Sequence, residues 1–127
     1  MTQDPPSIQV VKQIDLGNLD AKPELFADDV VWHYHNPNLP DVTGDYIGLE
    51  GIKAFFRKVA ALSKGTFRVD PQSIIPIGNE LVFVHVRDIL TIDGKKIALD
   101  VVVVWRIVDG QVREVWDIVP TEAEVLT

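Results

Sequence analysis

The stretch TIDGKKIALDVVVVWRIVDGQVREVWD, residues 91–117, decides the fold. Asp93-Gly94 is a two-residue signal for a β-hairpin turn, and Val108-Asp109-Gly110 fits a three-residue hairpin loop with its glycine in the left-handed region. Between the two turns, residues 99–107 form a nearly unbroken apolar run, which is typical of a strand buried on both faces. The stretch therefore predicts antiparallel pairing of three neighbouring strands, over residues 80–92, 95–107 and 111–119.

The residues before this meander predict one more strand of the same sheet, a separate strand and three helices. Alternation with period two starts at Thr66 and predicts a strand over 66–77 that is interrupted at Pro71. Further upstream, the pattern of apolar residues, caps and breakers predicts helices over 7–16, 20–28 and 48–64 and a strand over 30–35. Helices first and an antiparallel meander second indicate an α+β fold.

Length and composition limit the class of protein. With 127 residues the chain has room for one domain, and it contains no cysteine, which excludes disulfides and thiolate chemistry. The net charge of −7 disfavours a nucleic-acid partner. The polar start at residues 1–7 and the lack of a long apolar run predict neither a signal peptide nor a membrane span, so we expect a cytoplasmic protein.

The strand over 99–107, which is apolar on both faces, also predicts a protein partner. A domain of this size has too few helices to cover both faces of the sheet. The second apolar face of the run Leu99 to Ile107 would therefore be exposed to solvent. The simplest way to bury that face is against a second copy of the chain. We therefore expect a two-fold homodimer formed through the sheet.

Three segments carry a family resemblance: LFADDVVWH at 25–33, GLEGIKAFF at 48–56 and GQVREVWD at 110–117. They resemble SnoaL-like (polyketide cyclase-like) proteins of the nuclear transport factor 2-like superfamily, to which the ketosteroid isomerases belong. The similarity covers about residues 8–119 of a single domain spanning 1–127 with short frayed ends. It implies a cystatin-like α+β barrel, in which a conical, curved mixed sheet wraps around three N-terminal helices and leaves a deep apolar pocket at the wide end.

Hairpin pairing predicts which side chains face that pocket. A tight turn at 93–94 places Val84, Val86 and Asp88 opposite Val103, Val101 and Leu99, and a three-residue loop at 108–110 then places Val115 and Asp117 opposite Val103 and Val101. The resemblance implies that this face is the concave one. On the strand over 30–35 we favour Trp32 and Tyr34 inside over the alternative, His33 and His35. The expected ligand-binding residues are Trp32, Phe56, Val86, Leu99, Val101, Val103 and Val115.

Asp117 is the first candidate catalytic residue. A carboxyl among valines is desolvated, which raises its pKa and suits it to proton transfer near neutral pH. The resemblance points the same way, because a last-strand aspartate is the proposed acid/base of SnoaL-like cyclases. The alternative is that Asp117 only completes a buried polar network. Asp88 has the same inward parity, roughly 10 to 12 Å away by strand spacings, and either acts beside a ligand or pairs with Tyr34 or solvent.

Other mechanisms find less support. Carried over from the ketosteroid isomerases, the Asp base falls on Tyr34 and the protonated Asp on Val103, and the helix-one tyrosine has no counterpart. His33 and His35 share one direction on a strand, but no third metal ligand is fixed by the sequence. We therefore expect no metal and no organic cofactor.

The sequence thus predicts a protein with a pocket for a small apolar organic ligand. One candidate function is a cofactor-free isomerase or cyclase that transfers protons on an apolar or polycyclic carbonyl compound. In it, Asp117 removes a proton next to the carbonyl and Tyr34 or His35 donates a hydrogen bond to the enolate, with Asp88 as the next candidate base. The other candidate is a binding protein that uses the same pocket without catalysis.

Overall fold

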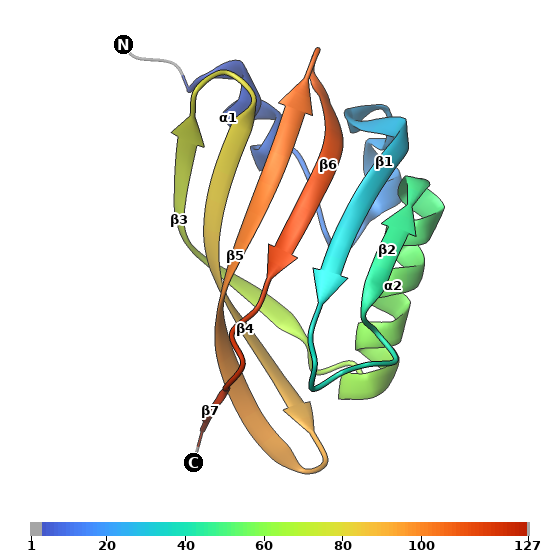
Figure 1. Cartoon of the computed structure of the whole chain (residues 1–127), viewed down its shortest axis with the longest axis vertical. Helices are drawn as coiled ribbons and strands as arrows, with labels where there is room; N and C mark the ends of the chain where they lie inside the picture. The colour runs from blue at the N-terminus through green and yellow to red at the C-terminus, as the bar shows by residue number, and fades with distance from the viewer. Residues whose placement is uncertain (1–3, 127) are drawn as a thin grey trace.

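Within the described residues, the fold is built from two helices, two short 3₁₀ turns and one seven-stranded sheet (Figure 1). A computed structural model describes residues 4–126, so the expectation for the extreme ends lies partly outside the described residues. The helical elements are α1 (Pro6–Lys12), η1 (Leu19–Ala21), η2 (Pro23–Leu25) and α2 (Gly48–Ser63). The strands are β1 (Phe26–His35), β2 (Gly44–Ile47), β3 (Arg68–Ile77), β4 (Leu81–Ile92), β5 (Lys95–Val108), β6 (Gln111–Ile118) and β7 (Glu124–Val125).

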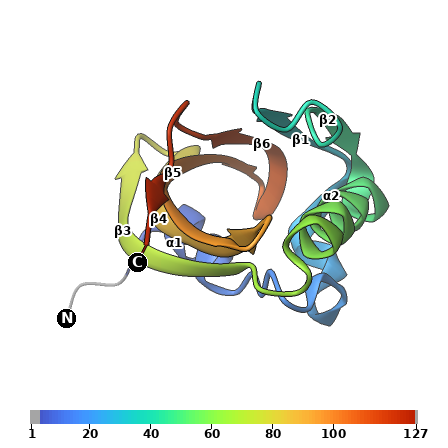
Figure 2. The same cartoon turned by 90° about the horizontal axis from the view of Figure 1, so that it is seen from below.

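The sheet is mixed and strongly curved. Its order is β2-β1-β6-β5-β4-β3, with β7 added to β5, and only β1 and β6 run parallel. Figure 2 shows the strands curling round one side while α2 lies against β1 and β2. The inner face of the sheet and the apolar side of α2 form the core, which includes Trp32, Ile52, Phe55, Val82 and Val112. The predicted α+β class and the curved mixed sheet are therefore confirmed.

Both hairpins of the central meander close with two-residue turns. Asp93 and Gly94 have φ of 51° and 77°, and Asp109 and Gly110 have φ of 52° and 76°, as a type I′ turn requires at both positions. The predicted pairing of β4 with β5 is confirmed, since Val84 lies opposite Val103 and Asp88 opposite Leu99. The three-residue loop expected at 108–110 is wrong, because Val108 pairs directly with Gln111.

A bulge in the next ladder determines where Asp117 lies. The register of β5 and β6 shifts between Arg106 and Ile107, so that Asp117 lies opposite Val103 and Val115 opposite Trp105. The prediction placed Asp117 opposite Val101, two residues further along. A shift of two residues keeps every side chain on its predicted face, since side chains alternate with period two. Asp117 therefore stays on the inner face although its partner was predicted wrongly.

The helical layer is smaller than expected. The second of the three predicted helices consists of the separate 3₁₀ turns η1 and η2. Pro23 explains the break, because its nitrogen cannot donate the bond that would continue a helix through this segment. The first helix ends at Lys12 rather than near residue 16. The edge strand β2 was not predicted. Within residues 4–126, no helix is long and apolar enough to cross a membrane, and the cytoplasmic location stays a prediction.

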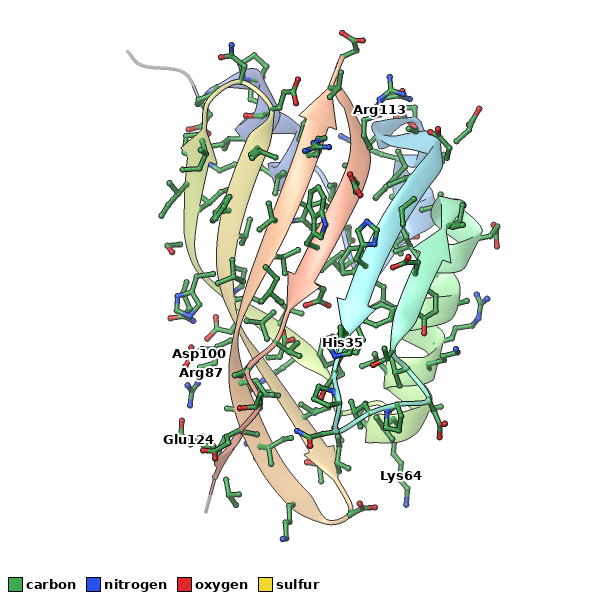
Figure 3. The ribbon with its side chains drawn as sticks, viewed as in Figure 1. His35, Lys64, Arg87, Asp100, Arg113 and Glu124 are labelled. Atoms are coloured by element: carbon green, nitrogen blue, oxygen red, sulfur yellow. The ribbon has the colours of Figure 1, made fainter. Side chains whose placement is uncertain are left out.

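The sequence suggested that the C-terminal segment frays after Pro120. The structure instead holds this segment against the sheet. β7 pairs with β5, with Val125 opposite Ile97, and Leu126 N donates to Lys96 O at 2.8 Å. Arg87 forms an ion pair with Glu124, and Figure 3 shows the two labelled side chains next to each other. These contacts hold the C-terminal segment against β4 and β5.

Candidate functional site

The parity of β1 decides which of its side chains enter the core. Trp32 is 2% exposed and Tyr34 is buried, whereas His33 is half-buried and His35 is exposed. The inward assignment of Trp32 and Tyr34 is therefore confirmed. His35, labelled at the end of β1 in Figure 3, borders a shallow groove that Tyr34 and Asp117 also line. His35 does not line the outer chamber, because alternate residues of a strand point to opposite faces, and its role as a hydrogen-bond donor stays a prediction.

A cavity of about 560 Å³ lies between α2 and the inner face of the sheet, and we call it the outer chamber. This volume falls within the range of small-molecule sites. Its wall is mainly apolar and comes from three regions of the chain. The lining side chains that the argument uses are Tyr34, Asn36, Phe56, Val59, Leu99 and Val119. Pro120, Thr121 and Ala123 of the C-terminal segment complete its wall.

A second cavity of about 150 Å³ adjoins the first on the side of α1 and β3, and we call it the inner chamber. Strands β4 and β5 line it with Val84, Val86 and Val103. Residues 11–16, at the end of α1 and after it, supply a further apolar wall. The contribution of this segment was not anticipated, since its apolar residues are equally typical of ordinary core packing.

Four side chains border both chambers: Phe56, Phe67, Asp88 and Asp117. We call this set the neck. The rings of Phe56 and Phe67 lie with their centroids 6.5 Å apart. Asp88 comes from β4 and Asp117 from β6, with β5 between them. The curved sheet thus brings the two predicted carboxyls to one constriction, although their register positions along β5 are four residues apart.

The environment of the neck raises the pKa of both carboxyls. Burial raises the pKa of Asp88 to about 7. Burial is also the main cause that raises the pKa of Asp117 to about 8, and the charge of Asp88 raises it further. Both residues are half-buried, and Asp117 also borders the shallow groove beside His35. These are pKa values suited to proton transfer near neutral pH.

Three polar atoms at the neck have no hydrogen-bond partner: Trp32 Nε1, Asp88 Oδ1 and Asp117 Oδ1. The indole N–H of Trp32 lies close enough to Asp117 to lower its pKa slightly, but the contact does not reach hydrogen-bond geometry. Buried polar groups are normally paired, and leaving one unpaired costs about 1–3 kcal/mol. Unpaired atoms in a cavity wall are therefore the expected mark of a ligand site.

Tyr34 is oriented by a residue that the sequence did not reveal. The side chain of Asn36 is buried, and its Nδ2 donates to Tyr34 Oη at 3.0 Å. Burial raises the pKa of Tyr34, so its hydroxyl stays protonated at neutral pH. Because the oxygen already accepts from Asn36, the phenolic proton is directed elsewhere, and Tyr34 borders the outer chamber. The sequence marked Asn36 only as a strand breaker.

The predicted ligand-binding residues divide between the chambers. Phe56 borders both, Leu99 borders the outer chamber, and Trp32, Val86 and Val103 border the inner one. Val101 and Val115 are fully buried but line neither chamber, so their assignment to ligand contact is wrong. For Val115 the reason is the register: it lies between Trp32 and Trp105, whose rings meet edge-on with centroids 5.6 Å apart.

The outer face of the sheet has a separate polar cluster. His33 contacts Asp45 at 2.7 Å and Glu114 at 2.6 Å, one through each ring nitrogen. Its ring stacks on Trp116, with centroids 5.6 Å apart. Both nitrogens of His33 are therefore engaged by carboxylates, and among residues 4–126 no group of three or more His, Asp or Glu side chains is placed to hold a metal ion.

A curved sheet folded over α2, with paired carboxyls in an apolar cavity, defines a pocket protein of the nuclear transport factor 2-like class. Residues 9–115 match the model of the SnoaL-like domain, and the chain belongs to this family. No curated protein matches the sequence significantly. The resemblance read from the sequence is therefore confirmed.

Solved structures show the same fold at low sequence identity. TerC, co-crystallized with polyporic acid, is 25% identical, with a TM-score of 0.75 over 91% of this chain and 92% of its own. A nuclear transport factor 2-like protein from Burkholderia pseudomallei is 23% identical, with a TM-score of 0.76 over 93% of each chain. A protein from Rhodopseudomonas palustris, provisionally named an isomerase, is 16% identical, with a TM-score of 0.64 over 95% and 93%.

Proposed function

We propose that this protein is a cofactor-free enzyme of the isomerase or cyclase type that transfers protons on a small apolar carbonyl compound. The observation that carries the proposal is the pair Asp88 and Asp117, two carboxyls with unpaired oxygens at the neck of an apolar cavity. Keeping two such groups out of water is costly for the fold. In this proposal, one carboxyl accepts a proton from the ligand and the other donates one to it.

The two carboxyls differ in a way that assigns their roles. Burial raises the pKa of both carboxyls, and the charge of Asp88 raises the pKa of Asp117 further, so Asp88 is the carboxyl that loses its proton first. Once Asp88 is charged, it disfavours ionisation of Asp117. We therefore assign Asp88 as the base and neutral Asp117 as the donor. This exchanges the roles expected from the sequence, in which Asp117 was the base.

The reaction then follows from the geometry of the neck. The carboxylate of Asp88 accepts a proton from the carbon next to the carbonyl, and the electron pair of that C–H bond forms the C=C bond of the enol. The carbonyl oxygen takes up the displaced charge and receives a hydrogen bond or a proton from Asp117. Tyr34, whose proton is free to donate, is a second donor from the outer chamber. Return of a proton to a different carbon completes an isomerisation.

The relatives are consistent with this proposal. TerC was co-crystallized with polyporic acid, and another protein of the fold is provisionally named an isomerase. The first supports a small organic ligand for a protein of this fold, and the second supports an isomerase. The substrate of the present chain is proposed here only as a class: an apolar compound with a carbonyl group.

The test is exchange of carbon-bound hydrogen for deuterium in D₂O, which reports enolisation without knowledge of the product. We choose 2-acetylnaphthalene, a neutral ketone, and follow deuterium in its methyl group by mass spectrometry. The wild-type protein should accelerate exchange, and Asp88→Asn should lose roughly 10²- to 10⁴-fold of the rate. Asp117→Asn should lose less, since an amide still donates a hydrogen bond.

Asp93→Asn is the matched control, because Asp93 borders the outer chamber from an exposed turn and should be dispensable for exchange. A larger loss in Asp117→Asn than in Asp88→Asn would restore the roles expected from the sequence. If calorimetry shows that the ketone binds and no exchange is accelerated, the enzyme proposal is wrong. The protein would then be a binding module, with its neutral carboxyls serving as hydrogen-bond donors.

A further inference from the structure

The cavity has two chambers of unequal size, and this division constrains the shape of the ligand. The outer chamber of about 560 Å³ and the inner chamber of about 150 Å³ share the neck residues Phe56, Phe67, Asp88 and Asp117. A compact ligand of one piece would use only the outer chamber. It would leave the inner chamber and its polar border unfilled.

The inner chamber has the size and lining of a site for one ring. An apolar protein cavity of about 150 Å³ binds benzene, and the inner chamber has this volume. Apart from the two carboxyls of the neck, its wall is made by aliphatic, proline and aromatic side chains, among them Ile14, Val84 and Trp105. An apolar group of the size of a six-membered ring or a short alkyl chain therefore matches the volume and the lining of the inner chamber.

The border of the inner chamber needs a hydrogen-bond acceptor. Trp32 is 2% exposed, and its Nε1 has no partner. An indole N–H can only donate, so its partner has to be an acceptor. Asp117, protonated at neutral pH, adds a second donor beside it. An oxygen atom at the neck would satisfy both groups at once, whereas a hydrocarbon passing through would leave both unpaired.

We propose that the ligand spans both chambers: a ring-sized apolar group fills the inner chamber, a carbonyl oxygen lies at the neck against Trp32 and Asp117, and a larger apolar body occupies the outer chamber. This rests on the proposed function only in taking the cavity as the ligand site. It adds that the substrate class is an unsymmetrical ketone, with its smaller group placed inward.

A series of 2-acylnaphthalenes tests this arrangement by isothermal titration calorimetry. The naphthyl body is too large for the inner chamber, and the acyl group grows from acetyl through propionyl and butyryl to benzoyl. Each methylene that enters the inner chamber should tighten binding about fourfold, and the benzoyl compound should also bind more tightly than the acetyl compound.

Two buried valines supply matched variants. Val84 borders only the inner chamber and Val59 only the outer one, and they are 9% and 7% exposed. Val84→Phe should abolish the gain along the acyl series while acetyl binding persists. Val59→Phe should weaken all members by a similar factor. If Val84→Phe does not fold, Val84→Ala serves instead, and its enlarged chamber should shift the preference to a longer acyl chain.

Trp32→Phe tests the oxygen at the neck. The substitution should weaken the binding of the ketones about two- to tenfold, as expected for one lost hydrogen bond. It should not change the affinity for the hydrocarbon 2-benzylnaphthalene, which has no oxygen. Equal affinity for every acyl group, or equal effects of Val84→Phe and Val59→Phe, would overturn the two-chamber arrangement while leaving the cavity as a ligand site. Absence of binding across the whole series would overturn both this inference and the proposed function.

Discussion

Asn36 Nδ2 donates a 3.0 Å hydrogen bond to Tyr34 Oη, and the two side chains border the same chamber. The carbonyl oxygen of the Asn36 side chain in turn accepts from Asn38 N at 3.0 Å. Asn36 is therefore fixed at both ends of its amide, and it holds the phenol of Tyr34 in one orientation. The amide also acts on the ionisation of the phenol, since its hydrogen bond lowers the pKa that burial raises.

The first prediction concerns the stability of this pair. Asn36→Ala removes one buried and one partly buried hydrogen bond and leaves the Tyr34 hydroxyl and the Asn38 N–H without these partners. We expect the free energy of unfolding to fall by about 1–3 kcal/mol, measured by urea denaturation. Asn38→Ala is the control, because the side chain of Asn38 is exposed and should contribute about 0–1 kcal/mol. Equal losses in the two variants would mean that Asn36 has no special structural role.

The second prediction concerns how stability depends on pH. The pKa values of Asp88 and Asp117 are about 7 and 8 in the folded protein, above the value near 3.9 expected when unfolded. The folded state therefore binds more protons than the unfolded state between these values. The stabilisation from keeping them protonated is complete below about pH 4 and is lost as pH rises to about 8.

Between about pH 5 and 7, each of these two carboxyls should lower the free energy of unfolding by about 1.4 kcal/mol per pH unit. Asp117→Asn removes one of them, so its stability curve should be flatter by that amount and should rise above the wild-type curve with increasing pH. Urea titrations at several pH values measure the slopes. Parallel curves for wild type and variant would show that the pKa of Asp117 is not raised.

The third prediction concerns the pH dependence of the proposed reaction. Exchange requires Asp88 ionised and Asp117 protonated, so the enzyme-catalysed rate should rise through about pH 7 and fall above about pH 8. The narrow maximum is visible after the uncatalysed rate is subtracted at each pH. Asp117→Asn should lose the falling limb and keep the rising one. A rate that falls through pH 7 in the wild type would exclude Asp88 as the base.

The part of this site that depends on local sequence patterns could be predicted from the sequence. Strict alternation fixed the inward set on β1, β4, β5 and β6, which placed both Asp88 and Asp117 on the concave face. It did not predict the bulge opposite Arg106 and Ile107, because nothing in the local pattern of β6 signals that Arg113 is an extra residue. The type I′ turn at Asp109-Gly110 was missed although it has the same Asp-Gly signal as Asp93-Gly94.

Other parts of the site depend on contacts between distant segments. Asn36 lies in an Asn- and Pro-rich stretch, where exposed turns are the ordinary expectation, and only its contact with Tyr34 marks it as a buried residue. The neck exists because the curvature of the sheet brings β4 and β6 together against Phe56 and Phe67. Curvature, and with it the division into two chambers, has no signature in the spacing of apolar residues.

The last prediction concerns the convex face of the sheet. A row of outward residues crosses four strands in register, from Ile75 through Phe83 and Val104 to Trp116. Ile75 and Phe83 are 51% and 38% exposed, so the row presents large apolar side chains to the surroundings. We propose that this row is the interface of a homodimer, as the doubly apolar strand first suggested.

Size-exclusion chromatography with light scattering should then give twice the mass of one chain at micromolar concentration, and Trp116→Glu should give the monomer mass. Trp116 also stacks on His33 and lies under Arg106, so Phe83→Glu is a second variant that leaves those contacts in place. Ile47→Glu, on the edge strand β2 and 66% exposed, is the control and should remain dimeric. A monomeric wild type would exclude the dimer, and a dimer that withstands both Trp116→Glu and Phe83→Glu would place its interface on another surface.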